Sequence, residues 1–265
     1  MGRGMYQFDE FTFACQGIAH PVFWHGSGPA VVVLHELSGV GLPTVDLGRR
    51  LAGAGFTVYL PAFYDRPGQI GMVGSAIRLF CLRREFTLLA LDRSSPVADW
   101  VRGLCREAHA RSGGPGVGVV GMCLTGGLAL AAMIDPKVLG AVCSQPALPS
   151  AFPPTRRRRA NLGLSPQDLE KAAASGTPVL TLRFRHDPIS PATRAGAICA
   201  AFGSNAQAVP VPEEGGYGSA HPPIRRFAHS PLTFDVVDRE GHPTRIALDR
   251  VIAFLRGALL DADSR

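Results

Sequence analysis

The sequence predicts an α/β protein whose mostly parallel sheet is doubly wound, with helices on both faces. Residues 30–34 and 138–143 are uninterrupted apolar runs, as expected of strands that are buried on both faces. From residue 30 onward, such runs alternate with amphipathic helical stretches, which is typical of βαβ units. With 46% hydrophobic and 18% charged residues, the composition is that of a folded globular protein.

The elements follow in order along the chain. An antiparallel pair is expected first, at residues 11–15 and 21–24. Further strands are expected at residues 30–34, 56–60, 117–122, 138–143, 178–184 and 206–211. Helices are expected at residues 43–54, 71–82, 96–111, 165–174, 191–202 and 243–260, with a short one ending near residue 134. No internal repeat is visible, so we expect a single domain over residues 1–265, with the Pro- and Arg-rich stretch 147–163 as a cap or lid.

The composition also limits the expected cellular location and binding partners of the protein. There is no apolar run of about 18 residues and no N-terminal apolar h-region, so neither a membrane span nor a secretory signal is expected. The six cysteines are scattered and form no CxxC pair, which favours a reduced, cytoplasmic protein without structural zinc. A monomer or small homo-oligomer that acts on a small molecule is expected.

The net charge of +6 contains one dense basic run, Arg156 to Arg159. Prolines precede this run and a helix start follows it, so it is expected in an exposed loop, where it is solvated or steers an anionic substrate. Aromatic residues that could stack on bases are missing from the run, so nucleic acid is not an expected partner.

The stretch from Val117 to Leu130 carries the main chemical signal. An apolar, β-branched run stops at Gly121, presents Cys123, and resumes after Gly126 and Gly127 as a small, helix-forming segment. This is the pattern of a nucleophile elbow, where a sharp strand-to-helix turn holds the nucleophile and requires small neighbours. The alternative is a buried core cysteine. The elbow predicts a nucleophile and half of an oxyanion hole.

An acid and a base should follow later strands of such a sheet. Asp187 comes directly after the 178–184 strand, where an N-cap or Asx turn is the alternative role. His221 and His229 both precede the last helix, and we favour His229 as the base because its neighbours are small. His242 stands at the start of that helix and is expected to cap it. The order nucleophile, acid, histidine is that of α/β-hydrolases.

The loop after the 30–34 strand reads His35-Glu36-Leu37-Ser38-Gly39-Val40. In this fold that loop supplies the second oxyanion amide. If Glu36 lies beside a thiol, its carboxylate could hold or accept the proton of that thiol. The alternative role of Glu36 is a salt bridge within the loop.

Together with the Gly-x-Cys-Leu elbow and the stretch Leu60 to Tyr64, this loop resembles the dienelactone hydrolase family. The resemblance implies an α/β-hydrolase fold and a triad of Cys123, Asp187 and His229. It further implies that Glu36 contacts the thiol at rest, that the amides of Leu37 and Leu124 form the oxyanion hole, and that Arg83 or Arg84 holds a substrate carboxylate. The activity implied is opening of carboxylated enol-lactones without metal or cofactor, by extension hydrolysis of small esters.

The sequence departs from the family pattern in two places. Thr125 intrudes before the paired glycines, where a β-branched residue needs extra room, and the loop 210–226 before the proposed base is long. A non-catalytic binding or thiol-sensing protein is therefore the alternative function. A dinucleotide site is disfavoured, because the glycines 116, 118 and 121 lie before and within the strand and no acidic residue follows about 20 positions on.

Overall fold

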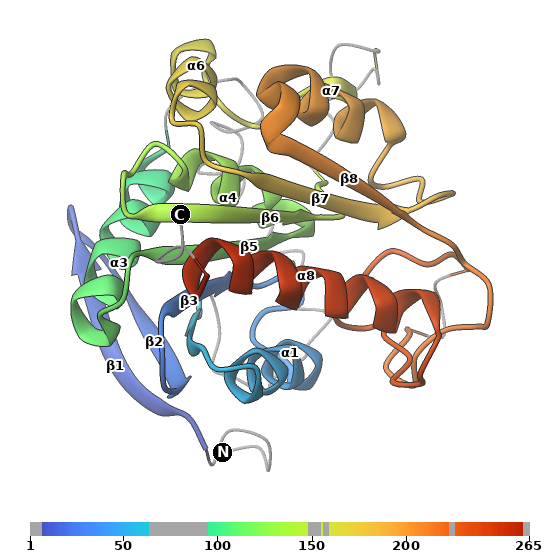
Figure 1. Ribbon diagram of the computed structural model, residues 1–265, viewed down its shortest axis with the longest axis horizontal. Helices are drawn as coiled ribbons and strands as arrows, with labels where there is room; N and C mark the ends of the chain where they lie inside the picture. Colours follow the sequence, from blue (N-terminus) through green and yellow to red (C-terminus); the bar gives the residue numbers. More distant parts are fainter. Residues whose placement is uncertain (1–6, 64–94, 148–154, 156–158, 223–225, 262–265) are drawn as a thin grey trace.

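The computed structural model describes residues 7–63, 95–147, 155, 159–222 and 226–261. These residues form one sheet of eight strands with the order β1-β2-β4-β3-β5-β6-β7-β8 (Figure 1). β1 (Asp9–Cys15), β2 (Ile18–Gly26) and β4 (Thr57–Pro61) pair antiparallel, and all other neighbouring strands are parallel. The parallel strands besides β4 are β3 (Ala30–Leu34), β5 (Val117–Met122), β6 (Val138–Ser144), β7 (Val179–Phe184) and β8 (Ala206–Val211). The predicted doubly wound α/β fold is confirmed.

Helices cover both faces of the sheet, and each face has its own core cluster. One face is covered by α3 (Pro96–Ser112), α4 (Gly126–Ala132), α6 (Pro166–Ala174) and α7 (Ala192–Phe202). The other is covered by α1 (Leu42–Gly53) and α8 (Pro243–Leu259), which crosses the sheet in Figure 1. These helices lie where the sequence predicts them; the helix expected at 71–82 is outside the described residues. None of the described helices is long and apolar enough to cross a membrane.

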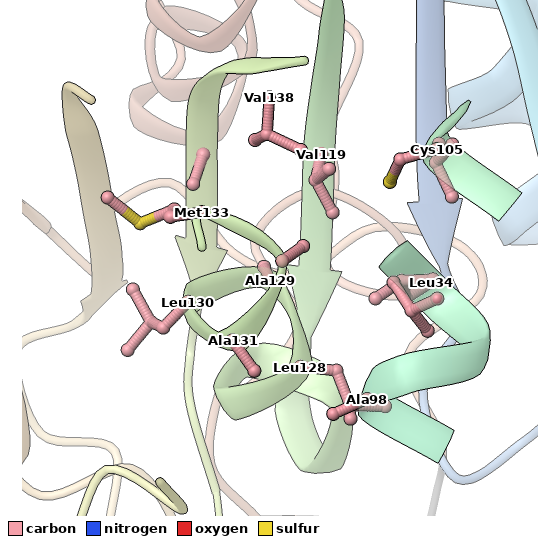
Figure 2. Close-up of a cluster of buried hydrophobic side chains, with 14 of the residues drawn as sticks. Leu34, Ala98, Cys105, Val119, Leu128, Ala129, Leu130, Ala131, Met133 and Val138 are labelled. Atoms are coloured by element: carbon pink, nitrogen blue, oxygen red, sulfur yellow. The ribbon is translucent and has the colours of Figure 1, made fainter. Parts of the chain in front are cut away.

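Side chains of the central strands alternate between the two faces. In β3, Val32 and Leu34 join the cluster under α3 and α4, whereas Val31 and Val33 join the cluster under α1 and α8. Figure 2 shows the first cluster, where Leu128 of α4 lies beside Ala98 of α3. Burial on both faces explains why these strands read as continuous apolar runs instead of alternating ones.

The strand order places the loops after β3 and β5 next to each other. From β3 the chain winds one way to β4 and the other way to β5, which makes this the point where the winding direction reverses. Leu34 at the end of β3 pairs with Gly121 near the end of β5. In doubly wound sheets, the crevice at the carboxyl ends of two such strands is where ligands bind.

Candidate active site

Cys123 sits at the sharp bend that follows β5. A short 3₁₀ turn, Cys123–Thr125, separates the strand from α4, and Cys123 has the left-handed φ of +54°. This conformation is strained for a residue with a side chain and is typical of functional sites. A methyl group added at Gly121 would lie 2.5 Å from the Thr125 carbonyl oxygen, so the bend requires glycine there. The side chain of Cys123 is partly exposed.

Thr125 stabilises this bend instead of straining it. The carbonyl oxygens of Leu34 (3.0 Å) and Met122 (2.9 Å) share the single proton of its Oγ1, which accepts from the Met122 amide at 2.9 Å. The buried hydroxyl therefore connects the turn that carries Cys123 to the end of β3. The ends of β3 and β5 thus accommodate the β-branched side chain of Thr125 and provide hydrogen-bond partners for its hydroxyl.

Asp187 lies in the loop after β7 and is buried. Its Oδ1 accepts the amides of Ile189 (2.9 Å) and Ser190 (3.2 Å), so the Asx-type turn considered for this residue is formed. Arg183, also buried, donates to the carbonyl oxygens of Ser190 (2.5 Å) and Asp187 (3.2 Å). These contacts fix the loop and leave the second carboxylate oxygen, Oδ2, for another partner.

That partner is His229. Its Nδ1 lies 2.7 Å from Asp187 Oδ2, and the ring is buried. Burial by itself lowers the pKa of the imidazole, but the hydrogen bond with Asp187 and the interaction with Cys123 outweigh it and raise the pKa to about 10. The second nitrogen, Nε2, makes no hydrogen bond of regular geometry with the described residues. The pKa shift nevertheless places the imidazole close enough to the Cys123 thiol to interact with it, and catalytic hydrogen bonds often become well aligned only when substrate binds.

The other candidate histidines lie in different surroundings. His221 has its own carboxylate, since its Nδ1 hydrogen-bonds Asp235 Oδ1, and its ring stacks on Tyr217 with centroids 4.1 Å apart. His242 is the N-cap of α8 and accepts the Thr244 amide at 3.3 Å through Nδ1, as the sequence predicts. Of the three, His229 is the one whose ring the structure couples to Cys123.

Glu36 lies at the end of β3 with its carboxylate buried in a set of donors. Ser230 Oγ donates to Oε2 at 2.8 Å, Gln145 Nε2 donates to Oε1 at 3.1 Å, and the Thr233 hydroxyl also donates to Oε1. These three donors were missed from the sequence. The carboxylate is therefore fixed beside the residue that follows His229, and the resting contact with the thiol stays a prediction.

The remaining predicted residues are placed only in part. Leu124 is the middle residue of the Cys123–Thr125 turn, and Leu37 lies in the loop after β3, whose last residue, Leu34, pairs with Gly121 of β5. Arg83 and Arg84 lie outside the described residues, as does most of the expected lid 147–163. Within the described residues, no group of three or more potential metal ligands is found.

Two further groups near the elbow were not expected. Arg194 of α7 is buried and donates to the carbonyl oxygens of Pro146 (3.0 Å) and Asn161 (2.8 Å). Burial lowers the pKa of Arg194, while interactions with Cys143 and Cys123 oppose that shift, so a guanidinium stands near the nucleophile. Cys143 itself is buried, and burial raises its pKa to about 12, which makes it unreactive.

Comparison with known proteins agrees with this architecture. The sequence matches the family model of the dienelactone hydrolase family over residues 18–211. The chain belongs to the dienelactone hydrolase family. It is thus a member of a family of hydrolases, and none of the curated proteins compared with it matches.

Solved structures of dienelactone hydrolases share the fold. A dienelactone hydrolase from Anabaena variabilis is 16% identical with a TM-score of 0.56, covering 96% of this chain and 100% of its own. A dienelactone hydrolase-like promiscuous phosphotriesterase, P91 from metagenomic libraries, is 12% identical with a TM-score of 0.67, covering 95% of this chain and 98% of its own. At these identities the likeness concerns the fold.

Proposed function

We propose that this dienelactone hydrolase family member is a cysteine-dependent hydrolase of small carboxylic esters or lactones. The observation that carries the proposal is the position of His229, which is hydrogen-bonded to Asp187 on one side and coupled to Cys123 on the other. Cys123 after β5, Asp187 after β7 and His229 in the loop before α8 thus act in one chain of interactions as nucleophile, orienting carboxylate and base. This is the arrangement that nucleophilic acyl transfer requires.

The reaction proceeds in two halves. A protonated His229 favours the thiolate of Cys123, whose sulfur attacks the carbonyl carbon while the oxygen takes up the negative charge. The amides of Leu37 and Leu124 stabilise that oxyanion. The intermediate then expels the alcohol or enol oxygen, which takes its proton from His229, and leaves an acyl thioester on Cys123.

The second half returns the enzyme to its starting state. Neutral His229 removes a proton from water, which attacks the thioester carbonyl and releases the carboxylic acid and the thiolate. Asp187 keeps Nδ1 as the protonated nitrogen, so that Nε2 faces the sulfur and the reacting oxygens in both halves. The buried ring favours these steps, since fixed dipoles act more strongly away from bulk water.

The experiment is hydrolysis of small aryl esters by the wild type, Cys123→Ala and Cys143→Ala. We expect Cys123→Ala to lose at least about 10³-fold in kcat, because it removes the nucleophile. Cys143→Ala is a matched control, since that thiol is buried in the same part of the molecule and has a raised pKa. Mass spectrometry should find the acyl group on Cys123 of the wild type. Turnover of Cys123→Ala at the wild-type rate contradicts the proposal, and absence of any acyl-enzyme favours the binding or thiol-sensing alternative.

A further inference from the structure

A second histidine–carboxylate pair supports the backbone of the proposed base. The carboxylate of Asp235 is fully buried, and His221 Nδ1 hydrogen-bonds its Oδ1. Its Oδ2 accepts the backbone amides of His229 and Ser230, both at 2.8 Å. The site described above uses neither Asp235 nor His221, yet this carboxylate holds the peptide that carries the base.

The segment 229–235, here called the base turn, is held by carboxylates at two places. The turn is closed by the amides of Thr233 (3.2 Å) and Asp235 (3.0 Å), which both donate to the Ser230 carbonyl oxygen. The Asp235 carboxylate accepts the backbone amides of His229 and Ser230 in this turn. The Glu36 carboxylate accepts from the Ser230 and Thr233 hydroxyls. The base turn is thereby fixed to the end of β3 and to the loop that contains His221.

Packing and hydrogen bonds together hold the base turn. Leu232 is buried in the core cluster under α1 and α8, while Leu232, Thr233 and Phe234 also line a cavity of about 710 Å³ that adjoins α1. The hydrogen bonds to the two carboxylates fix the backbone and the hydroxyl groups of the turn in addition to this packing. The Asp235 carboxylate is in turn oriented by His221, whose amide donates to the Gly218 carbonyl oxygen at 2.9 Å.

We propose that Asp235 is a positioning residue for the base, holding the backbone of His229 so that the imidazole stays against Cys123, and that His221 orients Asp235. This inference rests on the proposed function, in which His229 serves Cys123. A displacement of about 1 Å between reacting groups can cost about 10²-fold in rate. Because Asp235 holds the backbone amide of His229 itself, a shift of the base turn moves the imidazole relative to Cys123.

The test compares Asp235→Ala with Asp235→Asn. The alanine variant removes the hydrogen bonds to the amides of His229 and Ser230. We expect kcat for aryl esters to fall about 30- to 100-fold with little change in KM. The asparagine variant keeps an oxygen for the two amides, and its amide group can donate to His221 Nδ1 after a tautomer change, so it should recover at least about tenfold of that loss. His221→Leu, with Asp235 intact, should lie between the wild type and Asp235→Ala.

A second readout needs no turnover. The rate of Cys123 alkylation by iodoacetamide, measured against pH, reports how well the imidazolium favours the thiolate. In Asp235→Ala we expect the midpoint of alkylation to move upward, because His229 no longer keeps its place between Cys123 and Asp187. The shift should be largely absent from Asp235→Asn.

Asp135→Ala is the matched control. Asp135 is also buried, accepts the Lys137 amide at 3.0 Å and pairs with Arg106 at 2.6 Å, but it lies after α4, away from the base turn. If Asp235→Ala loses stability like Asp135→Ala while its kcat and its alkylation midpoint stay at wild-type values, the inference is overturned. Should Cys123→Ala hydrolyse esters normally, the proposed function fails instead, and the alkylation midpoint of Asp235→Ala still decides the role of Asp235.

Discussion

The two histidine–aspartate pairs of this hydrolase have the same local design and serve different neighbours. In each, one carboxylate oxygen accepts two backbone amides and the other faces a histidine Nδ1. For Asp187 the two amides belong to its own loop, at Ile189 and Ser190. For Asp235 they belong to the base turn, at His229 and Ser230. Asp187 thus holds the ring of His229, the proposed base, whereas Asp235 holds its backbone.

The comparison shows that a histidine–aspartate pair does not by itself identify a base. The two rings differ in what surrounds them beyond the carboxylate. His229 is coupled to Cys123, while the His221 ring stacks on Tyr217 at an interplanar angle of 12°. The proximity of Cys123 therefore distinguishes His229, the proposed base, from His221. The pair of His221 and Asp235 is better explained by the backbone amides of His229 and Ser230, which Asp235 accepts.

The first prediction ranks the two carboxylates. Asp187→Asn should lower kcat by about 10³-fold or more, because an amide facing Nδ1 favours the tautomer that points a proton at the sulfur. The loss should exceed that of Asp235→Ala by about tenfold, since orienting the ring is more direct than orienting its backbone. Steady-state kinetics on one aryl ester checks both variants. A larger loss of kcat in Asp235→Ala than in Asp187→Asn would contradict the different roles given to the two carboxylates.

The second prediction concerns the proton on His229. Burial lowers its pKa, whereas Asp187 and Cys123 raise it, with a result of about 10. In Cys123→Ala the interaction with the thiol is lost while burial and Asp187 still act, so the pKa of His229 should fall and the imidazolium should deprotonate at a lower pH. The imidazole signals followed by NMR against pH measure this, with Cys143→Ala as the control. An unchanged His229 midpoint in Cys123→Ala would show that the thiol does not face the ring.

The sheet and the bend that carries Cys123 could be predicted because their signals are local. The β3 and β5 runs are apolar without alternation, and Cys123 stands where a strand pattern changes to a helix pattern. Asp187 was predicted from its place after β7. The sharp turn between β5 and α4 was predicted as well, but the stabilising role of Thr125 was not, because the contacts of its hydroxyl depend on how closely β3 and β5 end.

The support around the base could not be predicted in the same way. Ser230 and Thr233 meet Glu36 across separations of 194 and 197 residues, and hydroxyl residues in loops carry no signal of such a partner. Asp235 offered a weak signal, since an aspartate that closes a Ser-Pro-containing turn is typical of side-chain capping of backbone amides. The choice between His221 and His229 depends on which loop reaches β5, and loop paths are set by contacts that the local sequence does not encode.

The smallest expected effect concerns the ring beside His221. Tyr217 is 43% exposed and stacks on His221 with 4.1 Å between centroids. Tyr217→Ala should lower the free energy of unfolding by about 0.5–1.5 kcal/mol and kcat by no more than about threefold, because His221 keeps its hydrogen bond with Asp235. Tyr217→Phe retains the stacking surface and should match the wild type. Urea unfolding and ester kinetics on the same samples measure both quantities. If Tyr217→Ala costs more activity than Asp235→Ala, the stacked ring, and not the carboxylate, holds the base turn in place.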